Sequence, residues 1–384
     1  MKRTNTIVLA VAGLAASAAH AQSSVTLYGV LDEGISYTSN VGGHSVWSIS
    51  SGNINGSRWG LRGSEELGSG FKAIFTLENG YNISNGTLGQ NGRLFGRQAF
   101  VGLSSSQYGS VTMGRQYDGV VDYLAPLSLT GTASGGTFFA HPYDNDNLDN
   151  AIRLNNTIKY SSVNYGGFKF GGMYGFSNST EFANNRAYSF GASYVFGGLT
   201  VATGYLQLNN DVNNFAVAVT SPGTATGTYG FKAGTQRTFG SGINYSFGSA
   251  ILGFVYSQTN LSNAAGGGVS AGQSGTHAGI SFAGDSARFQ NFEGNIRYFV
   301  TPSVLLSGAY TYTRSNLGGG LAPNYNQVSL LADYLLSKRT DLYLIGQYQH
   351  VSSNPEVHAY LNTLSATSST QTQINVSAGI RHRF

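Results

Sequence analysis

Two arginines in the sequence GSRWGLRG alternate with large apolar residues. Arg58 and Arg62 fall on one face of a strand, and Trp59 and Leu61 fall on the other, because successive side chains of a strand point to opposite sides. A guanidinium is charged at any physiological pH and presents donors that suit anions. The chemistry of such a face is the attraction of anions, provided that water reaches it.

Catalytic and metal-binding patterns are weak elsewhere. The sequence Gly-Val-Ser-Ala-Gly at 268–272 matches a hydrolase motif, but it lies in a glycine-rich segment without the strand and helix of a nucleophile elbow. No phosphate-binding loop occurs. We therefore expect no enzyme activity, no metal site and no cofactor. We interpret the scattered histidines as loop or interface residues: His44, His141, His277, His350, His358 and His382.

The N-terminus has the features of an export signal. Lys2 and Arg3 precede an apolar run and an Ala-x-Ala pattern that ends at Ala21, so residues 1–21 are predicted to be a cleaved signal peptide. The apolar run is shorter than the ~20 residues of a membrane-spanning helix, and no later segment supplies one. Cysteine is absent, although an exported chain could form disulfides.

The composition is polar without being charged. Charged residues make up 10% of the chain, well below the ~25% of soluble domains, while tyrosine and phenylalanine number 24 and 22. The net charge of +4 includes no basic cluster, which argues against a nucleic-acid partner.

An alternation with period two recurs along the mature chain. In the sequence FKFGGMYGF, Phe168, Phe170 and Tyr174 share one face, and mainly small residues occupy the other. With the turn signals, this pattern predicts sixteen strands, at residues 24–37, 57–66, 71–81, 93–104, 110–117, 151–163, 168–177, 186–196, 199–209, 235–248, 251–260, 286–299, 302–313, 326–337, 341–352 and 372–384.

The connections between these strands alternate between seven short turns and eight long loops. An even number of antiparallel strands with short turns at one end is typical of an outer-membrane β-barrel with periplasmic turns and extracellular loops. The last strand ends at Phe384 and can pair with the first, which closes the barrel and satisfies its edges. A soluble all-β array such as a propeller would instead show turns of uniform length and no sustained aromatic face.

Several segments resemble the general-diffusion porins of Gram-negative outer membranes, in particular their betaproteobacterial branch. They are SSVTLYGVLDEGISY, GSRWGLRGSEELGSGFKAIFTLENGYNISNG, GRLFGRQAFVGLSSSQYGSVTMGRQYD, RLNNTIKYSS and SAGIRHRF. The resemblance implies a homotrimer of sixteen-stranded barrels, each with a water-filled channel that an inward-folded third loop narrows. Residues 22–384 would form the barrel, and the third long loop, 118–150, would be the constriction loop.

In such a barrel the face opposite Trp59 and Leu61 lines the lumen. Arg58 is then expected at the constriction, and Arg62, nearer a short turn, in the vestibule. The resemblance implies a basic wall of Arg58, Arg97 and Arg153, with Arg115 as a lower-ranked member, and loop three offers Asp118 and Asp122 as an acidic side. Other basic residues are expected to be ordinary lumen or rim charges: Lys159, Arg186, Arg297 and Arg381.

The middle of loop three carries no charged residue from Tyr123 to Tyr143, so the arginines would face few carboxylates. A positive pore favours anions. We expect an anion-preferring general-diffusion porin for small hydrophilic solutes and ions, embedded in outer-membrane lipid and lipopolysaccharide. Two alternatives stay open: Asp118 and Asp122 neutralise Arg97 and Arg115, or the channel is specific for anionic solutes such as phosphate or organic acids.

Overall fold

The computed structural model describes residues 23–210, 231–264, 280–364 and 366–384. The predicted signal peptide and the sequence at 268–272 lie outside these residues. Within them, no helix is long and apolar enough to cross a membrane. The strands are β1 (Ser24–Val41), β2 (His44–Ser51), β3 (Arg58–Gly68), β4 (Phe71–Gly80), β5 (Gln98–Ser105), β6 (Gly109–Gln116), β7 (Leu154–Ser161), β8 (Phe168–Gly175), β9 (Arg186–Phe196), β10 (Leu199–Asn209), β11 (Thr235–Phe247), β12 (Ala250–Ser262), β13 (Ser286–Thr301), β14 (Val304–Asn316), β15 (Asn324–Leu335), β16 (Thr340–Ser352) and β17 (Thr372–Arg383). The short helical turns are α2 (Gly89–Gly92), η1 (Val120–Leu124), η2 (Ala125–Leu127), η3 (Gly136–Phe139) and η4 (Pro142–Asp144).

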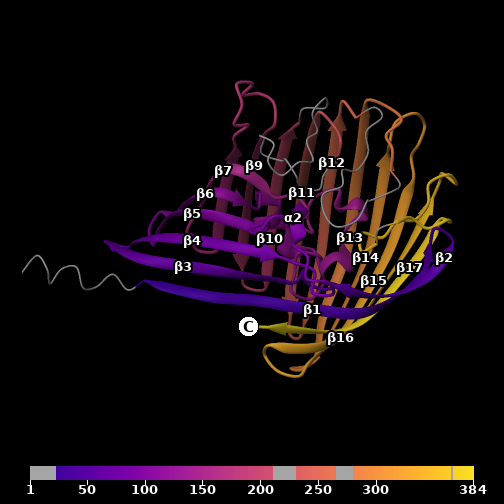
Figure 1. Cartoon of the computed structure of the whole chain (residues 1–384), viewed down its shortest axis with the longest axis horizontal. Helices are drawn as coiled ribbons and strands as arrows, with labels where there is room; N and C mark the ends of the chain where they lie inside the picture. The colour runs from indigo at the N-terminus through magenta and orange to yellow at the C-terminus, as the bar shows by residue number, and fades with distance from the viewer. Residues whose placement is uncertain (1–22, 211–230, 265–279, 365) are drawn as a thin grey trace, which may run out of the picture.

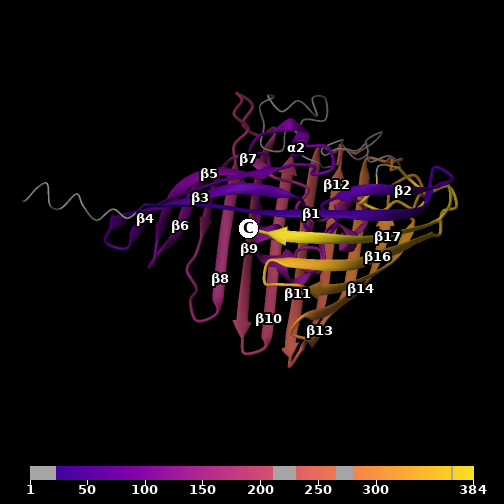
Figure 2. The same ribbon diagram turned by 60° about the horizontal axis from the view of Figure 1, so that its bottom comes forward.

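Sixteen of these strands form a closed antiparallel wall, which confirms the predicted barrel. The first strand, β1, pairs with β3 through Ser24–Val30 and with β17 through Val30–Thr38, so the two ends of the sheet meet (Figures 1 and 2). Seven short turns and eight longer loops join the wall strands, as predicted. The remaining strand, β2, is an addition: it pairs with the second half of β1 inside the segment that the sequence analysis assigned to the first loop.

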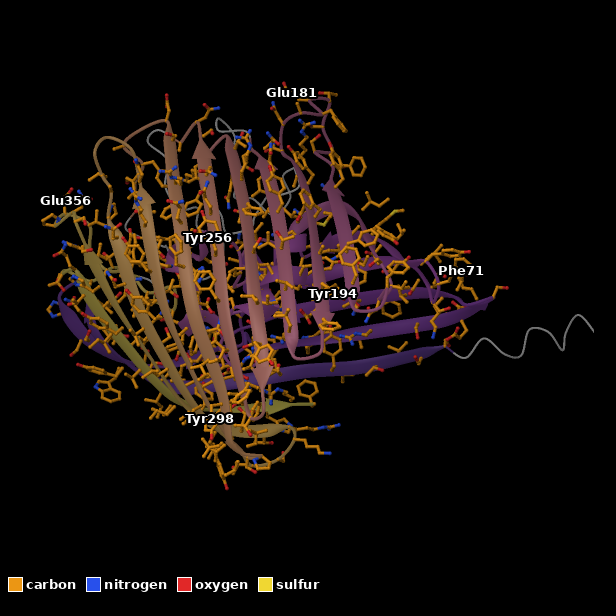
Figure 3. The ribbon with its side chains drawn as sticks, turned by 180° about the vertical axis from the view of Figure 1, so that it is seen from behind. Phe71, Glu181, Tyr194, Tyr256, Tyr298 and Glu356 are labelled. Atoms are coloured by element: carbon orange, nitrogen blue, oxygen red, sulfur yellow. The ribbon has the colours of Figure 1, made fainter. Side chains whose placement is uncertain are left out.

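Side chains alternate between the lumen and the outer surface along each wall strand. In β13, Asn291 and Glu293 are fully buried on the inner side, whereas Phe292 and Ile296 are exposed on the outer side. Figure 3 shows the outer surface, with Tyr298 toward the lower end of the wall and Tyr256 further up. The aromatic faces therefore point outward, as expected of strands that meet lipid.

Loop three, residues 117–153 between β6 and β7, folds into the barrel and lies against its inner wall. Its first helical turn, η1, packs directly against glycines of the wall strands β8–β11, where any side chain would collide with the turn. A Cβ at Gly204 would lie 2.8 Å from the Cα of Val120, and one at Gly240 would lie 2.4 Å from Cδ2 of Leu124. The glycines are direct partners across β8–β11: Gly171, Gly191, Gly204 and Gly240.

The large apolar side chains in the uncharged middle of loop three are buried against the wall, whereas the small residues Gly131 and Ala133 are exposed. Leu124 and Leu127 are buried with wall residues such as Leu206. Further along, the loop residues Leu129, Phe138 and Phe139 are buried with Ile54 of the first loop and with the wall residues Ala309, Leu331, Tyr343 and Ile345. Burial of these apolar side chains removes them from water, so they anchor the loop to the wall.

A third apolar cluster fills the inner side of the barrel on its loop-bearing half. Tyr143 of loop three stacks on Tyr360 at 5.3 Å between ring centroids and meets the edge of Tyr325. Buried residues of β12–β16 and the adjacent loops complete it, among them Phe231, Leu261, Phe282, Phe289, Leu317 and Val351. Side chains therefore occupy the part of the lumen beside β12–β16. Arg58, on β3, and Arg153, between β6 and β7, lie elsewhere along the wall.

Candidate functional site: an arginine cluster at the mouth of loop three

A carboxylate on β4 brings two of the predicted arginines together. Glu78 Oε1 accepts a hydrogen bond from Arg97 Nε at 2.8 Å, and Glu78 Oε2 lies 3.7 Å from Arg58 Nε. The Tyr28 hydroxyl donates to the same carboxylate at 3.0 Å. The register explains this meeting: Gly60 of β3 is the direct partner of Glu78, so the side chains flanking Gly60 on its face point into the lumen with the carboxylate.

The third predicted arginine joins them beside Tyr117. The guanidinium carbon of Arg153 lies 5.5 Å from the centroid of the Tyr117 ring, and its Nη2 donates to Asn150 Oδ1 at 2.8 Å. Tyr117 interacts electrostatically with all three arginines. The structure thus brings Arg58, Arg97 and Arg153 into one group, called here the arginine cluster.

Arg115, the fourth predicted member, lies on the other side of the wall. Its register partner is Ala99, which in turn pairs with Leu77 on the outer face. The guanidinium reaches back to main-chain carbonyls, donating from Nε to Gly96 at 2.8 Å and from Nη1 to Arg153 at 2.9 Å. The structure therefore leaves Arg115 outside the group formed by the other three arginines, because the alternation of β6 points its buried side chain away from the lumen.

The two carboxylates predicted for the acidic side have other partners. Asp118 is fully buried, and its oxygens accept from the Asn147 side chain at 2.6 Å and the Val120 N–H at 2.7 Å. Asp122 pairs with Lys159 at 2.8 Å. Within the described part of the chain neither forms an ion pair with an arginine, so their contacts give no support to the alternative in which they neutralise Arg97 and Arg115. Asp118 shapes the start of loop three, and Asp122 ties the loop to β7.

The carboxylates that do face the arginine cluster were missed. They are Glu78 and Asp149, the latter held by a hydrogen bond from Thr130 at 3.0 Å and interacting electrostatically with Arg97 and Arg153. The alternation of β4 carries a signal for Glu78, because it shares the inward face with Thr76 and Gly80. Three arginines thus stand against two carboxylates, and the cluster keeps an excess positive charge.

Replacing Glu78 by glutamine is expected to increase the preference for anions. The amide keeps an oxygen that can accept from Arg97, but it removes a negative charge beside the arginines. At about 4 Å in water, one charge is worth about 1 kcal/mol, or roughly fivefold in the permeability ratio. The reversal potential in a potassium chloride gradient measures this ratio. Glu66→Gln, in the exposed pair with Lys72, is the control, and equal reversal potentials for both variants would contradict the assignment of Glu78.

His141, read from the sequence as a loop or interface residue, is a buried ionic contact of loop three. Its Nδ1 lies 2.6 Å from Asp146 and its Nε2 2.9 Å from Glu293 on β13, and all three side chains are fully buried. Burial disfavours the charged imidazole, but Asp146 and Glu293 outweigh it and raise the pKa of His141 to about 10. The protonated ring therefore bridges two carboxylates and fixes loop three to the wall.

Arg381 holds the opposite part of loop three and is not the ordinary lumen or rim charge expected. Its guanidinium pairs with Asp341 at 3.0 Å and Asp333 at 3.2 Å, and it is 1% exposed. Nη1 donates to the carbonyl of Ala133 in loop three at 2.5 Å and to Asn55 at 2.7 Å. Arg381 on β17 thus links β15 and β16 to two loops, loop three through Ala133 and the first loop through Asn55.

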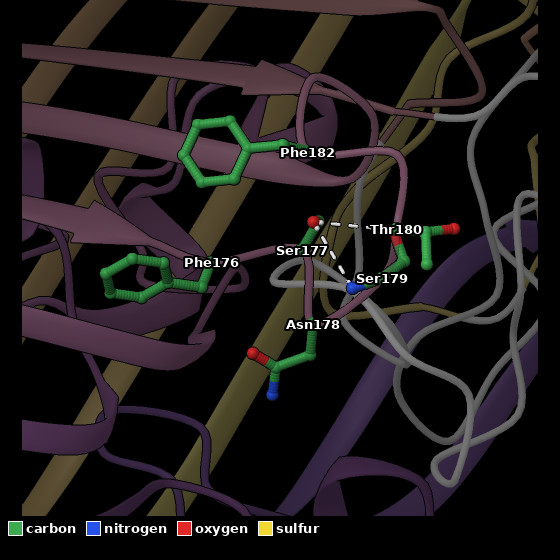
Figure 4. Close-up of a pocket in the computed structure, with 6 residues that line it drawn as sticks. All are labelled: Phe176, Ser177, Asn178, Ser179, Thr180 and Phe182. Atoms are coloured by element: carbon green, nitrogen blue, oxygen red, sulfur yellow. Dashed lines mark hydrogen bonds between the residues drawn. The ribbon is translucent and has the colours of Figure 1, made fainter.

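A hollow on the loop between β8 and β9 offers no comparable chemistry. It is lined by neutral side chains, from Phe176 to Thr180 and by Phe182, and Ser179 N–H donates to Ser177 Oγ across it (Figure 4). No group of three histidine, cysteine, aspartate or glutamate side chains in the described residues could hold a metal ion. The arginine cluster is the strongest candidate for a functional site.

Comparisons with known proteins agree with this geometry. The family model for the Gram-negative porin matches residues 7–354. An outer membrane porin of Bordetella pertussis is 33% identical over 416 aligned residues and covers 100% of both chains. Outer membrane porin protein 32 of Delftia acidovorans is 32% identical over 267 residues, which span 68% of this chain and 71% of the relative.

Solved structures share the fold. An anion-selective porin from Comamonas acidovorans superposes with a TM-score of 0.73 at 25% identity, covering 94% of this chain and 100% of the other. The trimer form of OmpT from Vibrio cholerae gives a TM-score of 0.65 at 17% identity, with coverage of 94% and 99%. The chain therefore belongs to the Gram-negative porins, the β-barrel channels of the outer membrane.

Proposed function

We propose that this porin passes small anions in preference to cations, and that the arginine cluster sets the preference. The carrying observation is the excess of Arg58, Arg97 and Arg153 over Glu78 and Asp149 on one side of the lumen. A ring of basic side chains raises the local concentration of anions and repels cations. The similar porin from Comamonas acidovorans is described as anion-selective, which supports the same sign here.

The proposed mechanism is filtration without covalent chemistry. The apolar clusters beside β12–β16 exclude water from that part of the lumen, so ions would pass beside β3–β7, where the charged residues lie. A solute there passes the net positive field of the arginine cluster, in which Glu78 and Asp149 lie directly against the arginines. Ordered water in such a field disfavours apolar solutes.

We also propose a homotrimer as the working assembly. Loop three and the three arginines belong to a single chain, so each subunit would conduct by itself. The OmpT structure of Vibrio cholerae in its trimer form has the same fold and supports this assembly.

A planar-bilayer recording tests both proposals. We expect conductance steps in groups of three and a reversal potential of the sign that chloride permeation gives in a potassium chloride gradient. Liposome swelling with neutral sugars and with anions of matched size would follow. Uptake of one anion that saturates would instead support the substrate-specific channel, and a cation-favouring reversal potential would sink the proposed selectivity.

The anion preference is expected to rise as the pH falls through 6. Burial raises the pKa of Asp149 to about 6, although its hydrogen bonds and Arg153 oppose the shift. Its carboxylate is charged above this pH and neutral below it, so acid removes a negative charge beside the arginine cluster. Reversal potentials on either side of pH 6 measure the change. Asp149→Asn should show the acid value at both; a pH response that survives in this variant would assign the titration to another carboxylate.

A further inference from the structure

Four arginines lie on the outer surface of the barrel, away from the channel. They are Arg186 on β9, Arg237 on β11, Arg288 on β13 and Arg314 on β14. In each strand the alternation places them on the face of outward aromatic residues: Phe190, Phe239, Phe292 and Tyr310. We call this set the outer arginine belt, and the proposed selectivity makes no use of it.

The belt follows the sheet across neighbouring strands. Arg237 and Arg288 are both direct register partners of Asn260, one on each side of β12. Since adjacent strands lie about 4.8 Å apart, the two arginine backbones are separated by roughly 10 Å. Amide side chains lie between them and beside them, and Arg237 Nε donates to Gln207 at 3.1 Å. Two guanidinium groups with amide donors between them can enclose one phosphate group.

The height of the belt matches one boundary of the membrane. Arg288 stands ten positions above Tyr298 in the same strand, which corresponds to roughly 25 Å along the barrel axis at the usual strand rise and tilt. This is about the height of the apolar band of an outer-membrane barrel. Tyr256, labelled in Figure 3, is the register partner of Phe292, and their ring centroids are 5.1 Å apart, four positions along the strands from the pair of Asn260 and Arg288. The belt therefore lies at the headgroup level on the side of the long loops.

Within the residues that the structure describes, no carboxylate forms an ion pair with the belt. The strands β9–β16 carry three carboxylates, and all of them are buried on the inner side: Glu293, Asp333 and Asp341. The lower ends of these strands carry no outward-facing charged residue. On the outward faces of β9, β11, β13 and β14, positive charge therefore occurs only at the end near the long loops.

We propose that the outer arginine belt binds the phosphate groups of lipopolysaccharide in the outer leaflet. Uncompensated arginines at headgroup height attract anionic lipids, and bidentate guanidinium contacts suit phosphate oxygens. The acyl chains would lie against the apolar and aromatic band directly below. A neighbouring subunit is the competing occupant, but the absence of outward carboxylates on β9–β16 gives it nothing to pair with from the same surface.

The test uses the purified full-length porin in detergent and lipid A that carries both phosphates. The variant Arg237→Gln/Arg288→Gln/Arg314→Gln keeps long polar side chains and removes three charges. At the usual contribution of one surface cation, its dissociation constant for lipid A should rise roughly 100-fold. Lipid A without phosphates should bind the wild type as weakly as the variant binds the phosphorylated form.

A matched control removes two cations at the other end of the barrel. Lys338→Gln/Arg339→Gln lies in the turn between β15 and β16 and should leave lipid A binding within twofold of the wild type. Both variants should keep the wild-type reversal potential, because none of these side chains faces the lumen. The proposal would be overturned if the triple variant bound lipid A as tightly as the wild type does, or if the wild type bound dephosphorylated lipid A as tightly as the phosphorylated form. It would also be overturned if the triple variant lost the trimer while lipid A binding stayed the same.

Discussion

Replacing Arg97 and Arg153 together by serine is expected to convert an anion-preferring channel into one that prefers cations. The wild-type cluster has three arginines against the carboxylates of Glu78 and Asp149. The double variant leaves Arg58 alone against the same two carboxylates, so the sign of the local charge reverses. A charge about 4 Å from the ion path is worth about 1 kcal/mol in water, so the permeability ratio should change on the order of fivefold for each arginine.

The reversal potential in a potassium chloride gradient measures this change directly. Arg62→Ser is the matched control, because Arg62 also faces the lumen but is more exposed and lies over the Tyr28 ring at 4.8 Å, nearer the periplasmic turn. It should move the reversal potential much less than the double variant does. If the double variant kept the anion preference, the arginine cluster would have to be removed from the selectivity mechanism.

The barrel could be predicted from the sequence because its signal is local. Strand pairing repeats the same period-two pattern in every wall strand, and turn length distinguishes the two ends. Arg58 and Arg62 follow this pattern: they are the register partners of Val30 and Thr26 and face the lumen. Trp59 and Leu61 share the outer face with Leu27. The added strand β2 was not predicted, because the alternation of Trp47 and Ile49 with Ser48 and Ser50 is short and lies within a long connection.

The site was predicted only in part. Arg115 was assigned to the pore although the local pattern of β6 indicates the outer face. In β6, Val111, Met113 and Arg115 are alternate residues, and Met113 is 56% exposed on the outer face. The same alternation rule that placed Arg58 would have placed Arg115 outside. The resemblance to porins outweighed the pattern there, and the pattern was correct.

His141 and Arg381 each have a partner from a distant part of the chain. His141 and Glu293 are 152 positions apart, and Arg381 meets Ala133 across 248. No spacing in the sequence indicates these contacts, because they depend on the path that loop three takes along the inner wall. The sequence analysis therefore interpreted His141 only as a loop or interface residue and Arg381 only as an ordinary lumen or rim charge, although each one holds loop three in place.

Replacing His141 by leucine is expected to release loop three from the wall. The protonated imidazole bridges Asp146 and Glu293, and leucine would leave both carboxylates buried without a cation. Removing one partner of a buried ionic group costs about 3–5 kcal/mol. Because the strands pair without this contact, the loss should appear as local opening of the loop and not as loss of the barrel. The expected readouts are a noisier open-channel current and proteolysis within residues 117–153 of a barrel that stays folded.

The pH dependence and a compensating variant separate this ionic contact from simple packing. The folded pKa of His141, about 10, lies above its ordinary value of 6.5, so its contribution is complete below pH 6.5 and is lost as the pH rises through 10. Wild-type loop opening should therefore increase near pH 10, and His141→Leu should show it already at neutral pH. Combining His141→Leu with Asp146→Asn and Glu293→Gln removes all three charges together, which is commonly close to neutral for a buried ionic group. This triple variant should recover a quiet channel at neutral pH; current as noisy as that of His141→Leu would mean that the volume of the imidazole, and not its charge, secures the loop.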